Sequence, residues 1–146
     1  MRTHSFLPVF SALAVSTAFL LASPAMAEVV KYKATLDGSQ QSPPVTTKGK
    51  GTATFTFDTA KKKLSWNVKY SGLSGPATAA HIHAGRPGRS GAVLIPLCAP
   101  CRTGATGTVA VPAAAMQAVL SGATYVNVHT KKNPGGEVRG QLTVQG

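Results

Sequence analysis

Histidines are the residues whose type and spacing in this chain best fit a chemical site. The motif His81-Ile82-His83 places two imidazoles two residues apart, and His129 follows later in the run Asn127-Val128-His129. Residues i and i+2 of a β-strand project to the same side, so His81 and His83 share a face if the motif lies on a strand. The same parity groups His129 with Asn127.

Burial of the intervening apolar residues would bring the two histidine faces together. If Ile82 and Val128 face the core, then His81, His83 and His129 all lie on the outer side of the sheet. Three neutral imidazoles make an open site for copper or zinc, with a coordination position left free. We therefore predict a transition-metal site formed by these three residues.

Two polar residues are expected to support the imidazoles from outside. Placing Val138 on the Val128 side puts Glu137 on the His129 side, where its carboxylate could fix an imidazole tautomer, and Asn127 shares that face. The alternative is that the histidines only hydrogen-bond neighbouring loops, and the nearby Arg139 would oppose a bound cation. A full two-metal dismutase site is excluded, because it needs more histidines than these three and an aspartate ligand. A single-metal copper redox activity stays open as an alternative.

The motif Cys98-Ala99-Pro100-Cys101 offers a second kind of chemistry. Arg102 stands where a c-type haem attachment site requires histidine. A thioredoxin-like role needs the first thiol at a helix N-terminus, whereas loop residues follow this motif. A short-range disulfide is the leading interpretation for an oxidising compartment. Its small loop gives only a modest entropic stabilisation, and a metal site shared with the histidines is an alternative.

The elements that must position these residues are strands. Apolar and polar residues alternate with period two in short runs separated by connections rich in glycine and proline. The expected strands are residues 29–36, 52–58, 64–70, 78–83, 92–97, 107–111, 123–130 and 137–144. Residues 112–120 are rich in alanine and begin with proline, so one short helix of about two turns is expected there. About eight strands of this kind predict an antiparallel β-sandwich or small barrel.

The N-terminus has the pattern of a secretory signal peptide. Arg2 precedes an apolar stretch, which ends in Ser23-Pro24-Ala25-Met26-Ala27, with small residues at both cleavage positions. We expect cleavage after Ala27, a single mature domain over residues 28–146, and a periplasmic or secreted location without a membrane span. Export removes nucleic acid from the expected partners.

Charge and composition limit the function further. The chain of 146 residues has a net charge of +11, with 15 Lys and Arg against 4 Asp and Glu. The lysines are scattered, which favours a solvated surface, although binding to an anionic cell-surface polymer is an alternative. With so few carboxylates and no Ser/His/Asp arrangement, no catalytic site is predicted.

Two segments identify a family. Residues 75–85, which contain His81 and His83, and residues 125–142, which contain His129 and the run Asn133-Pro134-Gly135-Gly136, closely resemble the CHRD (chordin-type) domain. The resemblance covers essentially the whole expected mature chain. Members occur in bacterial exported proteins and as repeats in the animal extracellular antagonist chordin.

The resemblance implies a fold and a compartment. It implies an immunoglobulin-like β-barrel distantly similar to copper-zinc superoxide dismutase, and no settled general activity comes with it. The chain departs from the family at Gln40, Gln41 and Ser42, where an acidic residue often precedes the Pro-Pro pair. The leading hypothesis is therefore an exported, non-enzymatic CHRD-type binding or structural module that binds a transition metal.

Overall fold

Nine strands and one α-helix form the domain in the computed structural model, which describes residues 28–146. A 3₁₀ turn over Gly38–Gln40 follows the first strand. The helix α1 spans Ala113–Leu120. The strands are β1 (Val29–Asp37), β2 (Lys50–Asp58), β3 (Lys63–Ser71), β4 (Ala77–Ala84), β5 (Val93–Cys98), β6 (Ala105–Ala110), β7 (Thr124–Thr130), β8 (Val138–Gln141) and β9 (Thr143–Val144).

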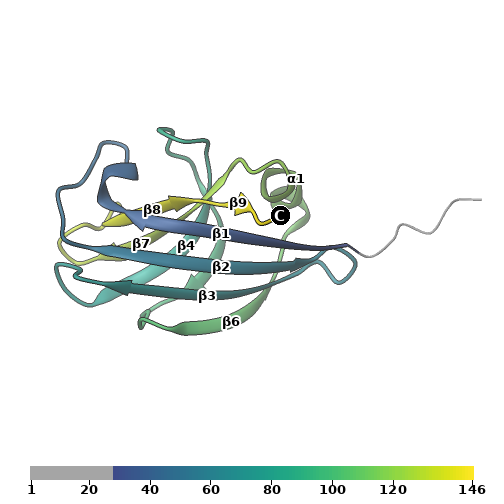
Figure 1. Cartoon of the computed structure of the whole chain (residues 1–146), viewed down its shortest axis with the longest axis horizontal. Coiled ribbons are helices and arrows are strands. Elements are labelled where there is room, and N and C mark those ends of the chain that lie inside the picture. The colour runs from purple at the N-terminus through teal and green to yellow at the C-terminus, as the bar shows by residue number, and fades with distance from the viewer. Residues whose placement is uncertain (1–27) are drawn as a thin grey trace, which may run out of the picture.

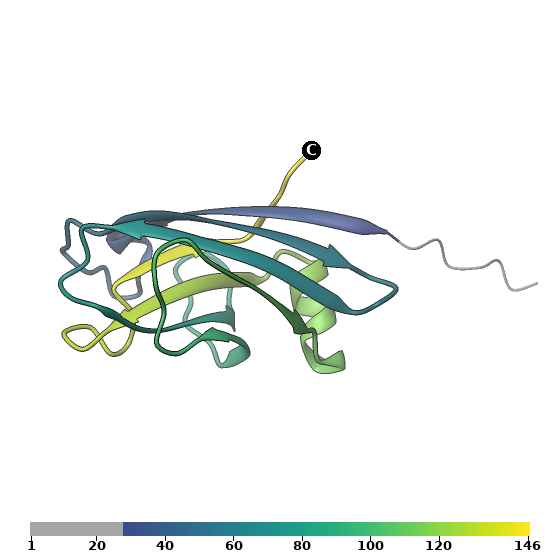
Figure 2. The ribbon, with the colours of Figure 1, turned by 90° about the horizontal axis from the view of Figure 1, so that it is seen from below.

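Antiparallel pairing joins the strands in the order β5-β4-β7-β8-β1-β2-β3-β6, with β9 added to β1. The outer strands of this order, β5 and β6, also approach each other, so the sheet is a nearly closed barrel. Figure 2 shows it as two layers, with β1, β2 and β3 in one and β4 and β7 in the other. The predicted all-β sandwich or barrel with one short helix is confirmed.

The first layer follows the simple alternation of its sequence. Tyr32 on β1 pairs with Phe55 on β2, which pairs with Trp66 on β3, and all three are buried. Every second residue on these strands belongs to the same core, while the residues between them face outward. Burial of one face thus sets the register, since a slip by one residue would exchange the two faces.

The second layer is covered on both sides. Ile82, Val126 and Val128 belong to the core, as expected. Every residue of β7 is buried, however, including the polar ones that face away from the core. Figure 1 shows β7 and β4 side by side behind β1, and their pairing places His81 opposite Asn127.

The expected last strand is divided. Instead of one strand over residues 137–144, the structure has β8 and β9, separated at Leu142, whose backbone N–H donates to the Thr124 carbonyl. The short β9 then turns to pair with β1. A continuous alternation in sequence therefore does not ensure a continuous strand, because two neighbouring strands compete for the same backbone groups.

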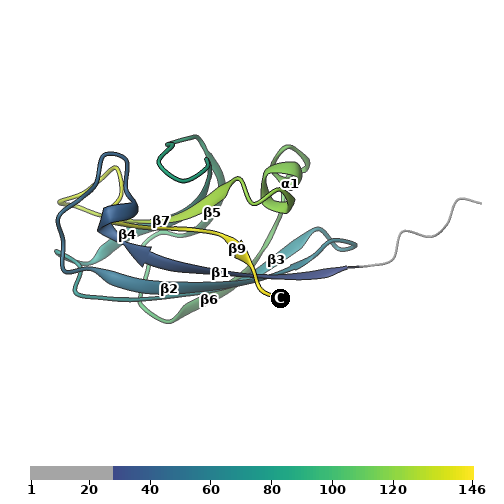
Figure 3. The same ribbon diagram turned by 45° about the horizontal axis from the view of Figure 1, so that its top comes forward.

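The helix lies where the sequence predicted it. Pro112 is its N-cap, Ser121 its C-cap, and Gly122 adopts a positive φ of 69° directly after it. Ala115 and Val119 add to the core, and Figure 3 shows α1 at one end of the molecule. In the part of the chain that the structure describes, no helix has the length and apolar character needed to span a bilayer.

Candidate metal centre

His81, His83 and His129 come together on the face of the second layer that points away from the core. Each offers one imidazole nitrogen, and these three atoms lie within 4.8 Å of one another. The ring centroids of His81 and His129 are 4.9 Å apart, and each lies 5.8 Å from that of His83. The predicted clustering of three histidines from β4 and β7 is what the structure contains.

The side chain of His129 is held from outside by backbone. Its Nδ1 lies 2.9 Å from the carbonyl oxygen of Pro134, which can only accept, so Nδ1 donates. In the neutral ring the lone pair therefore sits on Nε2. That atom lies 3.1 Å from Nδ1 of His81. In the metal-free protein, Nδ1 of His81 must donate this bond, and a metal ion between the rings would replace its proton.

His83 is held in the same way from the other side. Its Nδ1 donates to the carbonyl of Gly91 across 3.1 Å, which leaves the lone pair on Nε2. This Nε2 is buried and has no hydrogen-bond partner. A buried polar atom without a partner is costly, and such groups in native structures often mark a functional site. His83 is one of the three clustered residues, so this atom is the nitrogen of its neutral ring that is available to a metal ion.

Burial favours the neutral form of two of these imidazoles. It lowers the pKa of His81 below its ordinary value, with smaller contributions in the same direction from His129 and His83. Burial also lowers the pKa of His83, aided by the charges of His129 and Arg139 and opposed by the bond to Gly91. Because a metal ion binds the unprotonated nitrogen, these shifts favour the ligating form.

Loops cover this face, which explains why it is buried. Arg139, only 2% exposed, donates to the carbonyls of Arg86 (3.0 Å) and Arg89 (2.8 Å). Its guanidinium lies 3.4 Å from the ring centroid of Tyr125. The His83 ring stacks on Tyr125 at 5.0 Å with an interplanar angle of 10°. The loop after β4 is therefore tied down by the same side chains that surround the cluster.

The expected role of Glu137 needs correction. Its carboxylate is buried and accepts hydrogen bonds from Ser74, Thr47, Thr130 and Asn133. None of its partners among the described residues is an imidazole. The alternation of residues along the strand predicted that Glu137 lies beside His129. Hydroxyl groups from three segments donate hydrogen bonds to its carboxylate instead. Backbone carbonyls, which every residue carries, take the outer hydrogen bonds of the imidazoles.

Asn127 supports the cluster one step further away. Its Nδ2 donates to the carbonyl of Gly135 across 3.0 Å, directly beside the Pro134 carbonyl that receives His129. Its Oδ1 accepts from Nε2 of Gln41 at 2.7 Å. Gln41 lies in the segment where members of the family often have an acidic residue. Because Oδ1 of Asn127 can only accept, the side chain that bonds to it must be a donor, as the amide of Gln41 is.

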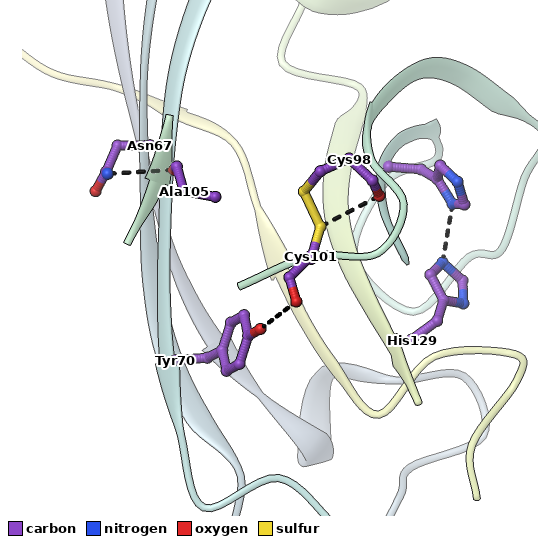
Figure 4. The surroundings of a disulfide bond; sticks show 7 residues. Asn67, Tyr70, Cys98, Cys101, Ala105 and His129 are labelled. Carbon is purple, nitrogen blue, oxygen red and sulfur yellow. Dashed lines mark hydrogen bonds between the residues drawn. A yellow bond between two sulfur atoms is a disulfide. The ribbon is translucent and has the colours of Figure 1, made fainter. Parts of the chain in front are cut away.

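The two cysteines are joined and stand apart from the histidines. Cys98 and Cys101 form a disulfide with a Cα–Cα distance of 5.2 Å, as predicted. Figure 4 shows this bond beside Tyr70, whose hydroxyl donates to the Cys101 carbonyl at 3.1 Å. Cys98 pairs with Ala80, a core residue on the opposite side of β4 from His81. The cluster of potential ligands found in the described residues contains histidines alone, so a shared cysteine–histidine site is not formed.

The comparisons with known proteins support one family. The model of the CHRD domain matches residues 32–142 of the chain. This range includes all three clustered histidines and both cysteines. Comparisons with curated proteins and with solved structures gave no match.

Proposed function

The chain belongs to the CHRD-domain family, and from that premise we propose that it is an exported binding module that holds a transition-metal ion through His81, His83 and His129. Copper and zinc are the ions whose preferences fit a set of imidazole donors. Cleavage after Ala27 would deliver the domain to the periplasm or the exterior.

The observation that carries the proposal is the orientation of the imidazoles. Backbone carbonyls hold Nδ1 of His83 and of His129, so the lone pair of each neutral ring is on Nε2. Nε2 of His129 lies against Nδ1 of His81, and Nε2 of His83 has no hydrogen-bond partner. A histidine that only supported a loop would not need a buried, unpartnered Nε2. Bonds from imidazole nitrogen to zinc are about 2.0–2.1 Å long, so small side-chain rotations would suffice to bring nitrogens within 4.8 Å around one ion.

Metal titration of the mature protein tests this proposal. Purified, metal-stripped protein is titrated with zinc and with copper, and bound metal is measured by elemental analysis after gel filtration. We expect one ion per chain for the wild type and at least a tenfold weaker affinity for His83→Ala. Thr54→Ala, an exposed residue of β2, serves as the matched control. Equal binding by wild type and His83→Ala would contradict the proposal.

A further inference from the structure

The donor set of the cluster carries no negative charge. All three donors are neutral imidazoles in the ligating form, and the outer partners of His83 and His129 are the backbone carbonyls of Gly91 and Pro134. Within residues 28–146, none of the four carboxylate side chains, those of Glu28, Asp37, Asp58 and Glu137, belongs to the cluster. Asp37 and Asp58 form ion pairs with lysines, and Glu137 is bound by hydroxyl and amide donors. The protein therefore does not neutralise the charge of a bound ion with its own ligands.

A fixed positive charge lies beside the cluster instead. The guanidinium of Arg139 sits 3.4 Å from the centre of the Tyr125 ring, and the His83 ring stacks on the same Tyr125 at 5.0 Å. The sum of these two distances is therefore the largest possible separation between Cζ of Arg139 and the centre of the His83 ring. Arg139 is 2% exposed, and its described hydrogen-bond partners are the carbonyls of Arg86 and Arg89. No carboxylate forms an ion pair with it in the described chain.

This arrangement discriminates between ions by their charge. The repulsion between Arg139 and a bound ion grows in proportion to the charge of that ion, and burial reduces the screening by water. A divalent ion therefore experiences twice the penalty of a monovalent one. Three nitrogen donors also complete the trigonal coordination that monovalent copper adopts, whereas zinc sites take a fourth ligand.

We propose that the cluster holds copper as the monovalent ion in preference to divalent copper or zinc, because Arg139 places an unpaired positive charge beside three neutral donors. This inference rests on the proposed function, since it concerns the same three histidines. It assigns Arg139 the role of a specificity-determining residue that does not touch the ion.

Competition with chromophoric chelators tests the preference directly. Mature wild-type protein is titrated with monovalent copper under oxygen-free, reducing conditions, and separately with zinc and divalent copper. We expect monovalent copper to bind at least tenfold more tightly than zinc. Cyclic voltammetry of the copper-loaded protein then gives the midpoint potential of the bound couple.

Charge-changing variants separate the effect of Arg139 from the rest of the fold. In Arg139→Gln we expect the ratio of monovalent to divalent copper affinity to fall about tenfold, which lowers the midpoint potential by about 59 mV. Arg102→Gln, which removes an exposed arginine, should leave the ratio unchanged. Arg139→Lys should retain most of the preference. Circular dichroism of each variant checks that it folds.

The outcomes distinguish this inference from the proposed function. One contrary result is that the wild type binds zinc or divalent copper with a higher affinity than monovalent copper, and loses this binding in His83→Ala. That result would overturn the preference for monovalent copper and leave the proposed metal site intact. An unchanged affinity ratio in a folded Arg139→Gln would overturn the role of Arg139. Binding of every ion that is unaffected by His83→Ala would instead refute the proposed function. The comparison of ions on the wild type stays decisive even if Arg139→Gln does not fold.

Discussion

At the scale of single residues, the centre is defined by how three imidazoles are oriented. His83 and His129 each donate from Nδ1 to a backbone carbonyl, which leaves the lone pair of the neutral ring on Nε2. His81 is linked directly to His129, because its Nδ1 donates a hydrogen bond to Nε2 of that residue. Protons and a metal ion therefore compete for the same nitrogen atoms.

Metal affinity should consequently depend on pH in a defined direction. Burial lowers the pKa of His81 and His83 below 6.5, so both stay unprotonated at neutral pH. We expect the affinity to change little between pH 8 and pH 6.5, where these two nitrogens are already free. At lower pH, once the pH passes the lowered pKa values of these imidazoles, it should fall by roughly tenfold per pH unit for each proton displaced.

Isothermal titration at several pH values, corrected for protonation of the buffer, measures this dependence. A chelator whose own pH dependence is known provides the control. An affinity that stays constant from pH 8 down to the lowest pH at which the protein remains folded would show that imidazole nitrogens are not the ligands.

At the scale of elements, the loops are fixed by buried polar groups rather than by apolar packing. Glu137, directly before β8, accepts bonds from Thr47, Ser74 and Asn133, which lie in three separate connections. Burial alone would raise the pKa of Glu137, but hydrogen bonds from Ser74, Thr47 and Thr130 outweigh it and lower the pKa to about 2. The ionised carboxylate therefore accepts the hydrogen bonds that hold these three connections together.

Replacing this carboxylate should destabilise the fold. Glu137→Gln puts an amide NH₂ among donors, so at least one buried donor loses its acceptor, and we expect a loss of about 2–3 kcal/mol in the free energy of unfolding. Urea denaturation at pH 7 measures it. Asp58→Asn, at an exposed hairpin, is the matched control and should change little.

The same variant should also alter the response to acid. Because the folded pKa of Glu137 lies below the ordinary 4.5, its contribution is fully present above that value and is lost as the pH falls toward 2. Glu137→Gln should therefore flatten the fall in stability over this range. An equally steep fall in the variant would contradict the assignment.

At the scale of the whole molecule, the described fold begins directly at the expected cleavage site. β1 begins at Val29, directly after the first residue of the expected mature chain, and the CHRD match begins at residue 32. Glu28 already takes part in the fold, since its backbone N–H donates to Thr59. The expected signal peptide, residues 1–27, lies outside the described residues.

Cleavage after Ala27 is therefore expected to leave a complete domain. Expression with export in a bacterial host, followed by intact-mass analysis, should show a chain that starts at Glu28. Ala25→Arg with Ala27→Arg, which removes both small cleavage residues, is the control and should block processing. A full-length species retained in the membrane fraction of the wild type would contradict this expectation.

The sequence alone determined the fold class and the shared face of the histidines, because both depend on local periodicity. Ile82 and Val128 must be buried, so their neighbours His81, His83 and His129 have to project to the other side. The pairing of Cys98 with Cys101 was likewise predictable, since they are close in the chain.

Only the tertiary structure decided what surrounds these residues. The carbonyls of Gly91 and Pro134 became partners of imidazoles because loops fold back over β4 and β7, and no residue type signals such a backbone contact. Hydroxyl groups from distant segments donate hydrogen bonds to Glu137, and Arg139 is buried against the Tyr125 ring without a carboxylate partner among the described residues. These contacts depend on how loops pack in three dimensions, which the period of a strand does not encode.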